Sequence, residues 1–383
     1  MKRIAVSSHQ NWQNSLARTG FDYQAIDPSY WHKNWQDGVC YVFDESQIDE
    51  LKRTTEELHQ MYFTAACHVI KTGDYTRLGI DNVAADLIEQ SFHPDTPTLY
   101  GRFDLCYDGI SPPKLYEYNA DTPTLILESG LAQWHWLNSQ SSLNHAKQFN
   151  RIHECLLVEF KALKTNSPMY FAAMADETED FIATRYLQDT ARQAGLNTCF
   201  IDVGDIGHDQ TSGNFVDLYN TTIRTLFKLY PWEWLLQEEF GQYISNANTV
   251  FIEPAYKLLY ENKALLAILW ELFPNHPNLL PAHLEPNKLK GDFIQKPFFS
   301  RQGANITLHT ECDLTQAENP HNTKGFVYQQ AKQPPTFTKQ NAQIVHTIIG
   351  SWIIGHGAAG IGIRESRTAI TDDDSVFVPH IFH

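Results

Sequence analysis

Four polar side chains alternate along two neighbouring stretches of the sequence in a pattern suited to holding a metal ion beside phosphate. Arg102 and Asp104 lie two residues apart in the first stretch, and Glu117 and Asn119 lie two residues apart in the second. If both stretches are strands, each pair projects from one face, and pairing the strands would gather a cation, two carboxylates and an amide oxygen. Such oxygen ligands suit Mg²⁺, which commonly takes one or two carboxylates and shares its shell with substrate phosphates. The alternative is a solvated, salt-bridged hairpin in which residues 119–123 form only an Asx-type turn.

Basic residues further along the chain stand in settings that suit a triphosphate. Lys263 lies at a predicted helix start, and Lys296 lies on a predicted strand that leads to a glycine-containing loop with Arg301. A lysine pairs with phosphate as a point charge, and an arginine pairs with it as a two-pronged fork. For either lysine alone, an isolated surface residue is by far the commoner explanation. The set is informative because these residues, with Arg102 and Arg364, lie in stretches rich in glycine or carboxylates although the chain has only 29 Lys and Arg.

Other catalytic and nucleotide-binding patterns are absent or fail on their context. Residues 355–360 match G-x-G-x-x-G, but residues 361–364 read as a strand where a dinucleotide site requires a helix. We therefore expect a glycine-bearing hairpin turn there. No G-x-x-x-x-G-K-[ST] phosphate loop, H-E-x-x-H zinc motif or G-x-S-x-G nucleophile elbow occurs in the sequence.

The elements that must position the first four side chains follow from apolar spacing and turn residues. From Glu45 to about Ile70 apolar residues recur at helical spacing, with Asp44 or Ser46 as the N-terminal cap. Residues 99–106 and 115–118 are short apolar runs separated by a turn-rich segment. We predict one long amphipathic helix followed by two paired strands.

The second half of the chain predicts a mixture of helices and strands. Residues 169–173, 179–194 and 198–203 read as strand, helix and strand, which indicates a β-α-β unit with a local parallel sheet. Residues 262–273 are predicted to form a further helix. Short β segments are expected after it at residues 293–297, 326–329, 348–354, 361–364, 369–371 and 376–378. The expected fold class is mixed α/β of the α+β kind.

Composition narrows the classes of function. The 29 Lys and Arg against 45 Asp and Glu give a net charge of −16, which argues against general nucleic-acid binding and against anionic lipid surfaces. The six cysteines are widely spaced with no C-x-x-C pair, so reduced thiols are expected. The N-terminus has no secretory apolar region, and the longest apolar stretch, Leu265 to Phe273, is about half of a membrane span. We expect a cytoplasmic protein.

Six separated segments resemble the synthetase part of glutathionylspermidine synthase, and more closely its stand-alone bacterial relatives, which are described as acid–amine ligases. The resemblance runs in order from about Trp12 to the C-terminus. Each segment holds polar residues of the kinds described above, and the six are residues 101–104, 117–124, 262–265, 296–305, 328–329 and 360–365. The family has an ATP-grasp fold and joins a carboxylate to an amine through an acyl phosphate. The resemblance therefore implies an ATP- and Mg²⁺-dependent ligase.

The resemblance also implies roles for individual residues. Asp104, Glu117 and Asn119 match the Mg²⁺ ligands, and Arg102 matches the residue that neutralises charge on the transferring phosphoryl group and contacts the nucleotide. Further active-site arginines are matched by Arg301 and Arg364.

Nucleotide and substrate contacts are carried over in the same way. Lys263 and Lys296 match lysines on the ATP phosphates, and the strand that contains Gln329 and Gln330 matches the segment whose backbone meets adenine. The acid-substrate side of the family's site is matched by Thr122 and Thr124. The implied partners are small molecules, a peptide-like acid and a polyamine-like amine; glutathione and spermidine are the family's known pair, and another acid and amine remain open.

Three parts are expected within one tightly joined chain, since 383 residues correspond to two or three folding units. Residues 1–165 would carry the hairpin with the metal and acid-substrate residues. Residues 166–255 would form a substrate-side β-α-β part of the kind that precedes an ATP-grasp, and residues 256–383 would bind ATP. The polar, weakly patterned loop from Thr307 to Lys324 is a candidate lid.

Departures from the family's pattern leave two other functions open. The amidase part of the bifunctional relatives has no counterpart in the sequence, so we expect no hydrolysis of the conjugate. Gln302 replaces a common Glu, and Ser366 and Ala369 replace the usual Asp and Leu. One alternative is a non-catalytic nucleotide-binding regulatory module that keeps the fold, and another takes Asp104 and Glu117 as a hydrolase's acid/base pair. Retention of a transition-state arginine beside the metal and phosphate residues favours the ligase.

Overall fold

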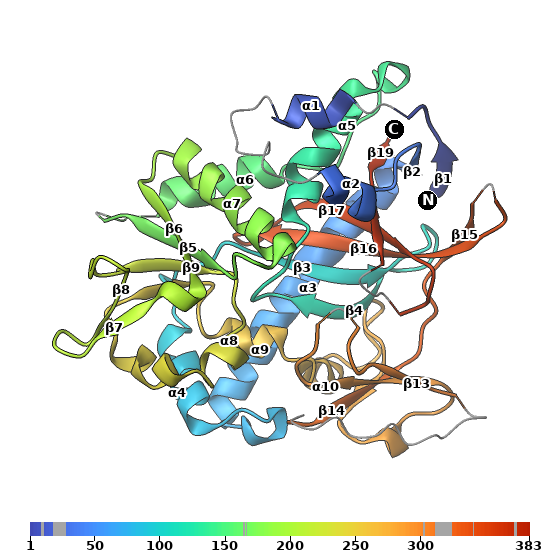
Figure 1. The fold of residues 1–383 in the computed structure, drawn as a ribbon. Coiled ribbons are helices and arrows are strands. Elements are labelled where there is room, and N and C mark those ends of the chain that lie inside the picture. Colours follow the sequence, from blue (N-terminus) through green and yellow to red (C-terminus); the bar gives the residue numbers. More distant parts are fainter. Residues whose placement is uncertain are drawn as a thin grey trace.

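The structure is a computed structural model that describes residues 1–8, 11–17, 28–163, 165, 167–301, 303–310, 324–339, 341–370 and 374–383. Its strands form three larger sheets and two small ones, and helices pack against the larger sheets (Figure 1). The predicted mixed α/β class is confirmed by this arrangement.

The central sheet carries the predicted hairpin. Its strands lie in the order β18 (Val376–Val378), β17 (Gly357–Ser366), β16 (Ile344–Ile354), β3 (Tyr100–Cys106) and β4 (Lys114–Asn119), with β15 (Thr336–Thr338) also paired to β16. Every pair in this sheet is antiparallel. The predicted strand pair is confirmed, and the segments predicted at residues 348–354 and 361–364 belong to the longer strands β16 and β17.

The connections of this sheet settle two predictions from the sequence. Gly355, with φ +58°, lies in the turn between β16 and β17, so the G-x-G-x-x-G match is the expected hairpin turn. The strand predicted at residues 369–371 is wrong for residues 369 and 370, which form bends, and residue 371 lies outside the described residues. The physical reason is that the chain must reverse between β17 and its antiparallel neighbour β18.

One long helix covers one face of the central sheet (Figure 1). Helix α3 (Glu45–Thr72) begins at a capping box of Asp44 and Gln47 and ends at Gly73, which is left-handed with φ +69°. Its buried side chains pack against Phe103 and Tyr118, two strand residues whose rings stack at 3.8 Å. Because side chains alternate along a strand, the polar residues on either side of Phe103 and Tyr118 point to the opposite face of the sheet.

A second sheet is wholly parallel. Its strands lie in the order β10 (Val250–Ile252), β9 (Thr225–Lys228), β5 (Met169–Ala173) and β6 (Thr198–Asp202). Helix α7 (Thr178–Gln193) connects β5 to β6, which confirms the predicted β-α-β unit. The carboxyl ends of these strands face the central sheet, and α6 (Ile152–Ala162) and α8 (Trp232–Leu235) lie near the junction (Figure 1). The ends of parallel strands are where α/β sheets usually bind ligands.

A third sheet carries the predicted phosphate lysine. It is antiparallel, in the order β11 (Ala282–His283), β14 (Phe326–Gln330), β12 (Phe293–Pro297) and β13 (Thr307–His309). The helix predicted at residues 262–273 is shorter, because α9 (Lys257–Glu261) ends at Asn262 and α10 (Leu265–Leu272) begins after it. The Asn262 side chain accepts the Ala264 N–H at 2.9 Å, which makes a turn between the two helices.

The remaining elements close the fold. Strands β1 (Lys2–Ala5), β2 (Val39–Phe43) and β19 (His380–Phe382) form a small sheet that brings the first and last strands close together (Figure 1). The other α-helices and strands are α1 (Asn11–Ala17), α2 (Pro28–Asn34), α4 (Asn82–Ser91), α5 (Gln133–Ser139), β7 (Gly207–Asp209) and β8 (Asn214–Val216). A helix with the length and apolarity to cross a lipid bilayer does not occur in the described part of the chain.

Candidate active site between the three sheets

The β3–β4 register brings the four hairpin residues together as predicted. Asp104 lies opposite Glu117, and Arg102 lies opposite Asn119. Two of these side chains are buried, since Arg102 is 6% exposed and Asp104 is 3% exposed. Asn119 does not form an Asx-type turn, because the backbone N–H groups of residues 120 and 121 donate to Glu261. The Asn119 amide nitrogen is buried with no partner among the described residues. The alternative of a solvated hairpin with an Asx-type turn is therefore wrong for Arg102, Asp104 and the backbone of residues 120 and 121. Its salt bridge, between Arg102 and Asp104, is present.

Asp104 is the centre of a buried charge network. Arg102 donates from Nε to one carboxylate oxygen at 2.9 Å, and Arg364 on β17 donates to the other at 2.6 Å. Arg102 also donates to the Thr124 carbonyl at 2.8 Å. Burial by itself would raise the pKa of Asp104, but the two arginines outweigh burial and hold that pKa below its ordinary value. Asp104 is thus held as an anion that positions two cations.

A glycine on the central strand makes room for Arg102. Gly350 on β16 lies opposite Asp104 on β3. A Cβ atom at Gly350 would lie 2.8 Å from the Cδ of Arg102 and 3.3 Å from its Cγ, closer than carbon atoms pack. Arg102 therefore reaches Asp104 only by crossing the bare backbone of β16.

The two predicted phosphate lysines converge on Glu117. Lys263 Nζ lies 3.6 Å from the Glu117 carboxylate and donates to the Ser300 carbonyl at 2.8 Å. Lys296 donates to the Tyr116 carbonyl and to the Gln329 side chain, each at 2.9 Å. Burial lowers the pKa of Lys296 to about 8. An anion bound beside Lys296 would favour its charged form, so the site is suited to phosphate.

Two cavities meet at the paired carboxylates. The larger has a volume of about 380 Å³ and is lined by Arg102, Asn119, Thr122, Thr124, Arg301 and Arg364 among others. The smaller has a volume of about 80 Å³ and is lined by Lys296, Gln329 and Gln330. Asp104 and Glu117 line both. The site residues predicted from the sequence are thus gathered around two adjoining cavities. Lys263 is the exception, because it lies beside Glu117 and lines neither cavity.

Arg301 enters the larger cavity from the loop after β12. Its Nη1 donates to Glu233, its Nε lies 3.4 Å from the Thr122 hydroxyl, and its guanidinium carbon lies 5.3 Å from the ring centre of Trp234. Its second terminal nitrogen, Nη2, is buried without a partner among the described residues, as is the hydroxyl of Ser300. Burial would lower the pKa of Arg301, but Glu233 and other carboxylates raise it. These orphaned donors suit an anionic ligand.

Sequence reasoning missed the acidic side of the larger cavity. Glu177, Glu179 and Asp180 line it where the chain leaves β5 and enters α7. Burial, followed by repulsion from Glu179 and Glu177, raises the pKa of Asp180 to about 7. The signal that could have found them is their place directly after the first parallel strand, where ligands bind in such sheets.

A buried ion pair supports the same wall and was also missed. Lys228, at the end of β9, donates to Asp121 at 2.6 Å, and the two side chains are 1% and 0% exposed. Asp121 also accepts the Trp232 backbone N–H at 2.8 Å. The pair joins the parallel sheet to the turn that carries Thr122 and Thr124.

The donor set fits a magnesium ion that is completed by phosphate. The described residues contain no group of three or more His, Cys, Asp or Glu placed to hold a metal ion. The carboxylates of Asp104 and Glu117 and the amide oxygen of Asn119 make a smaller set of oxygen donors on adjacent strands. Mg²⁺ held by this set would complete its shell with substrate phosphates and water.

Several predictions lie partly or wholly outside the described residues. Gln302 and Cys312 are not described, nor are residues 311–323 of the candidate lid. The five described cysteines are free thiols, as expected. Ala369 lines the smaller cavity, and Ser366 ends β17 two residues after Arg364.

Comparisons with known proteins place these observations in a family. The chain is 42% identical over 397 residues to the "Putative acid--amine ligase" of Haemophilus influenzae, with 100% of both chains covered. It is 26% identical to the trypanothione synthetase of Crithidia fasciculata and 24% identical to the bifunctional glutathionylspermidine synthetase/amidase of Escherichia coli. These alignments cover 84% and 89% of this chain but only 53% and 59% of the two relatives.

Structural similarity agrees with the sequence relatives. A glutathione synthetase-like effector from Globodera pallida superposes with a TM-score of 0.59 at 10% identity, covering 90% of this chain and 89% of that one. This likeness confirms the expected fold, and the named relatives confirm the expected enzyme class, a ligase. The model of the glutathionylspermidine synthase preATP-grasp family matches residues 3–383, so the chain belongs to that family.

Proposed function

We propose that this protein joins a carboxylic acid to an amine, using ATP and Mg²⁺ and forming an acyl phosphate on the way. The observation that carries the proposal is the junction at Asp104 and Glu117. One of the two cavities that meet there is lined by Lys296, and the other by Arg102 and Arg364. A phosphoryl group passing between two substrates needs such a boundary, with cations on both sides.

The smaller cavity suits the nucleotide phosphates. Lys296 and Gln329 line it, and Lys263 lies beside Glu117 at its edge. At about 80 Å³ it is smaller than a pocket for a whole nucleotide, so binding of ATP requires its walls to move apart. When bound, Mg²⁺ at Asp104, Glu117 and Asn119 would neutralise charge on the phosphates.

The larger cavity suits the acid and the reacting end of the amine. The acid's carboxylate would lie beside Arg102 and Arg364 and attack the γ-phosphate, which releases ADP and leaves an acyl phosphate. The amine nitrogen would then attack the acyl carbon and expel inorganic phosphate. In the first step the arginines would stabilise charge on the transferring phosphoryl group, and in the second they would stabilise charge on the departing phosphate. The protein's main contribution is positioning and electrostatic stabilisation.

We propose a peptide-like acid and a polyamine-like amine as the substrates. The names of the relatives from E. coli and C. fasciculata support this class, since they refer to conjugates of glutathione with spermidine and to trypanothione. The carboxylates of Glu177, Glu179 and Asp180 in the larger cavity would attract a cationic amine. The net charge of −16 acts in the same direction.

The test measures ADP release by the purified protein with ATP and Mg²⁺ across a matrix of small peptides and amines. We expect one acid–amine pair to stimulate ADP release and to yield a product with the summed mass less one water. The Arg102→Ala variant serves as the control and should release no stimulated ADP. If the protein binds ATP but no pair raises turnover, the alternative of a nucleotide-binding regulatory module replaces this proposal.

A further inference from the structure

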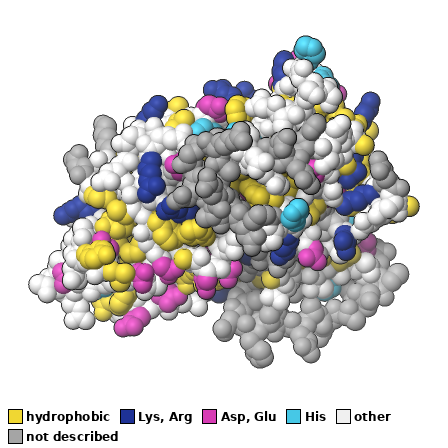
Figure 2. All heavy atoms as spheres, turned by 45° about the horizontal axis from the view of Figure 1, so that its top comes forward, with side chains coloured by type: hydrophobic (Ala, Val, Ile, Leu, Met, Phe, Trp, Pro, Cys, Tyr) yellow, Lys and Arg dark blue, Asp and Glu magenta, His cyan; other side chains and the backbone are white. Residues whose placement is uncertain are grey.

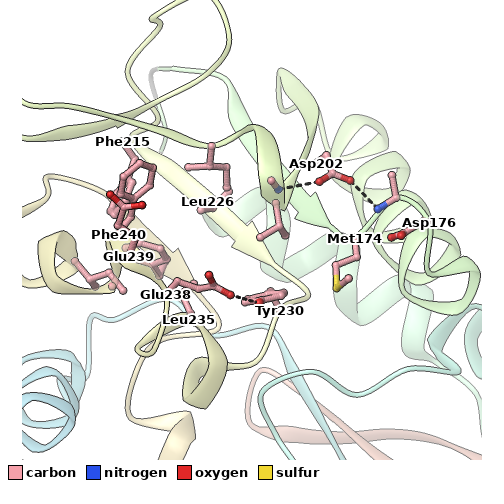
Figure 3. A pocket seen from close by; sticks show the side chains of 17 residues that line it. Met174, Asp176, Asp202, Phe215, Leu226, Tyr230, Leu235, Glu238, Glu239 and Phe240 are labelled. Atoms are coloured by element: carbon pink, nitrogen blue, oxygen red, sulfur yellow. Dashed lines mark hydrogen bonds between the residues drawn. The ribbon is translucent and has the colours of Figure 1, made fainter.

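A third cavity, larger than the other two, opens beside the reaction cavity. Its volume is about 690 Å³, and it lies at the carboxyl ends of β5, β6 and β9 (Figure 3). Met174 and Tyr230 line both this cavity and the reaction cavity of about 380 Å³. The two spaces are therefore neighbours that meet at these two side chains, and none of the site residues predicted from the sequence lines the larger one.

The walls of this cavity are apolar and its charges are all negative. Phe215, Leu226, Ile244 and Phe251 form much of the lining. The charged side chains among the described lining residues are carboxylates, with no Lys, Arg or His, and they are Asp176, Asp202, Glu238 and Glu239. Acidic side chains also gather beside hydrophobic ones on the left of Figure 2, the side that carries β5 to β9 in Figure 1. The complementary ligand has a hydrocarbon body and a positive charge.

Two of the four carboxylates are already committed within the protein. Asp202 accepts the backbone N–H groups of Gly204 and Ala175, each at 2.8 Å, and Glu238 accepts the Tyr230 hydroxyl at 2.6 Å (Figure 3). The carboxylates of Asp176 and Glu239 are exposed and make no hydrogen bond or ion pair among the described residues. In Figure 3, Met174 and Tyr230 lie toward one side of the cavity and Glu239 lies at the other, beside Phe215 and Phe240.

We propose that this cavity holds the non-reacting part of the amine substrate, an alkyl chain that ends in a second ammonium group. The reactive nitrogen would lie in the reaction cavity, the chain would pass Met174 and Tyr230, and the distal ammonium would pair with Glu239. This inference rests on the proposed function. The volume is within the range of small-molecule pockets, and the apolar walls favour an uninterrupted chain over one with an internal ammonium, which burial would desolvate.

The first test measures binding by calorimetry with 1,4-diaminobutane, 1,6-diaminohexane, 1,8-diaminooctane and octylamine as probes. We expect affinity for the diamines to rise about threefold for each added methylene, somewhat less than full burial would give. Glu239→Gln should lower the affinity for 1,8-diaminooctane about three- to fivefold, as for loss of an exposed ion pair. The affinity for octylamine should not change. Ala175→Trp, which places a bulky side chain on an exposed lining residue, should weaken both long amines more than tenfold.

Matched controls separate the cavity from its surroundings. Asp205→Asn removes an equal charge next to the lining residue Gly204 but outside the lining, and Ala175→Ser changes the same position without filling space. Both should bind every probe as the wild type does. If the wild type binds 1,8-diaminooctane no better than 1,4-diaminobutane, or if Ala175→Trp binds it unchanged, the proposal is overturned.

Measurements of turnover distinguish a failure of the cavity proposal from a failure of the ligase proposal. In the ADP-release assay, Ala175→Trp should raise KM for 1,8-diaminooctane more than tenfold and leave KM for butylamine unchanged, since the short amine does not reach the cavity. If no amine yields a condensed product while the binding pattern above is found, the ligase proposal fails and the cavity remains an amine site. If products form but their KM values are the same in Ala175→Trp, the cavity proposal alone fails.

Discussion

Asp104 and Glu117 lie directly opposite each other on β3 and β4, and each lines both the cavity with the lysine and the cavity with the arginines. They differ in their surroundings. The Asp104 side chain is 4% exposed and bound to two arginines, whereas the Glu117 side chain is 21% exposed and lies 3.6 Å from Lys263. Asp104 therefore has a structural role as well as a chemical one, and Glu117 is the more accessible of the two carboxylates.

Substitutions of these two residues should have different consequences. Glu117→Gln should lower Mg²⁺-dependent ADP release by about a hundredfold or more, as expected for loss of charge stabilisation at a phosphoryl group, with little change in stability. Asp104→Asn should lose activity and also lower the free energy of unfolding by about 3–5 kcal/mol. It leaves the buried Arg102 without its counter-ion and Arg364, whose side chain is 15% exposed, without the carboxylate to which it donates. Mg²⁺ titrations of activity and urea unfolding check both. Unchanged Mg²⁺ dependence in Glu117→Gln would contradict the metal assignment.

Gly350→Ala should displace Arg102. The added methyl group would lie 2.8 Å from the Arg102 Cδ, and the guanidinium is held at its other end by Asp104 and the Thr124 carbonyl. We expect kcat to fall about ten- to a hundredfold, since catalysis depends on position within fractions of an ångström, with a smaller change in KM for ATP. Gly357→Ala is the matched control, because a Cβ atom there meets nothing within 4 Å. Equal kcat values in the two variants would show that Arg102 tolerates the methyl group.

Lys228 and Asp121 should stabilise the folded state only when both are present. Lys228→Met or Asp121→Asn alone should lower the free energy of unfolding by about 3–5 kcal/mol, because each leaves one buried group without its partner. The double variant should lose less than the sum of the two. Urea unfolding of all three checks this, with Lys288→Met as a control, since the Lys288–Glu285 pair is more than half exposed and contributes at most about 1 kcal/mol. Strict additivity would mean that the two groups do not interact.

Asp180 should make stability depend on pH near neutrality. Burial raises its folded-state pKa to about 7, above the ordinary 3.8. The folded state therefore binds more protons than the unfolded state between about pH 4 and pH 7, and stability contributed by this group falls as the pH rises through that window. Asp180→Asn should be more stable than the wild type at pH 8, by on the order of 1–4 kcal/mol, and the difference should shrink toward pH 4. Unfolding curves at several pH values check this, and a difference independent of pH would contradict the shifted pKa.

The hairpin was predictable because its information is local. Alternation along a strand decides that Arg102 and Asp104 share a face, and the turn-rich segment decides that the two strands pair. The same holds for the capped helix at Glu45 and for the β-α-β unit after Met169. The wrong predictions concern features that local sequence patterns do not determine. The sequence does not show that Asn262 separates two helices or that residues 369–370 reverse the chain. Side-chain hydrogen bonds decide the first, and the order of the strands decides the second.

What the sequence determined by itself is the inventory of charged groups and the family to which the chain belongs, because types and spacing of residues are retained along the chain. Only the tertiary structure decided which groups meet. Gly350 clears the path of Arg102 from a strand more than 200 residues away, and Glu177, Glu179 and Asp180 reach the site because a parallel sheet presents its carboxyl ends to an antiparallel one. The 690 Å³ cavity likewise exists only between packed elements, since its walls come from strands and loops that no single stretch of sequence contains.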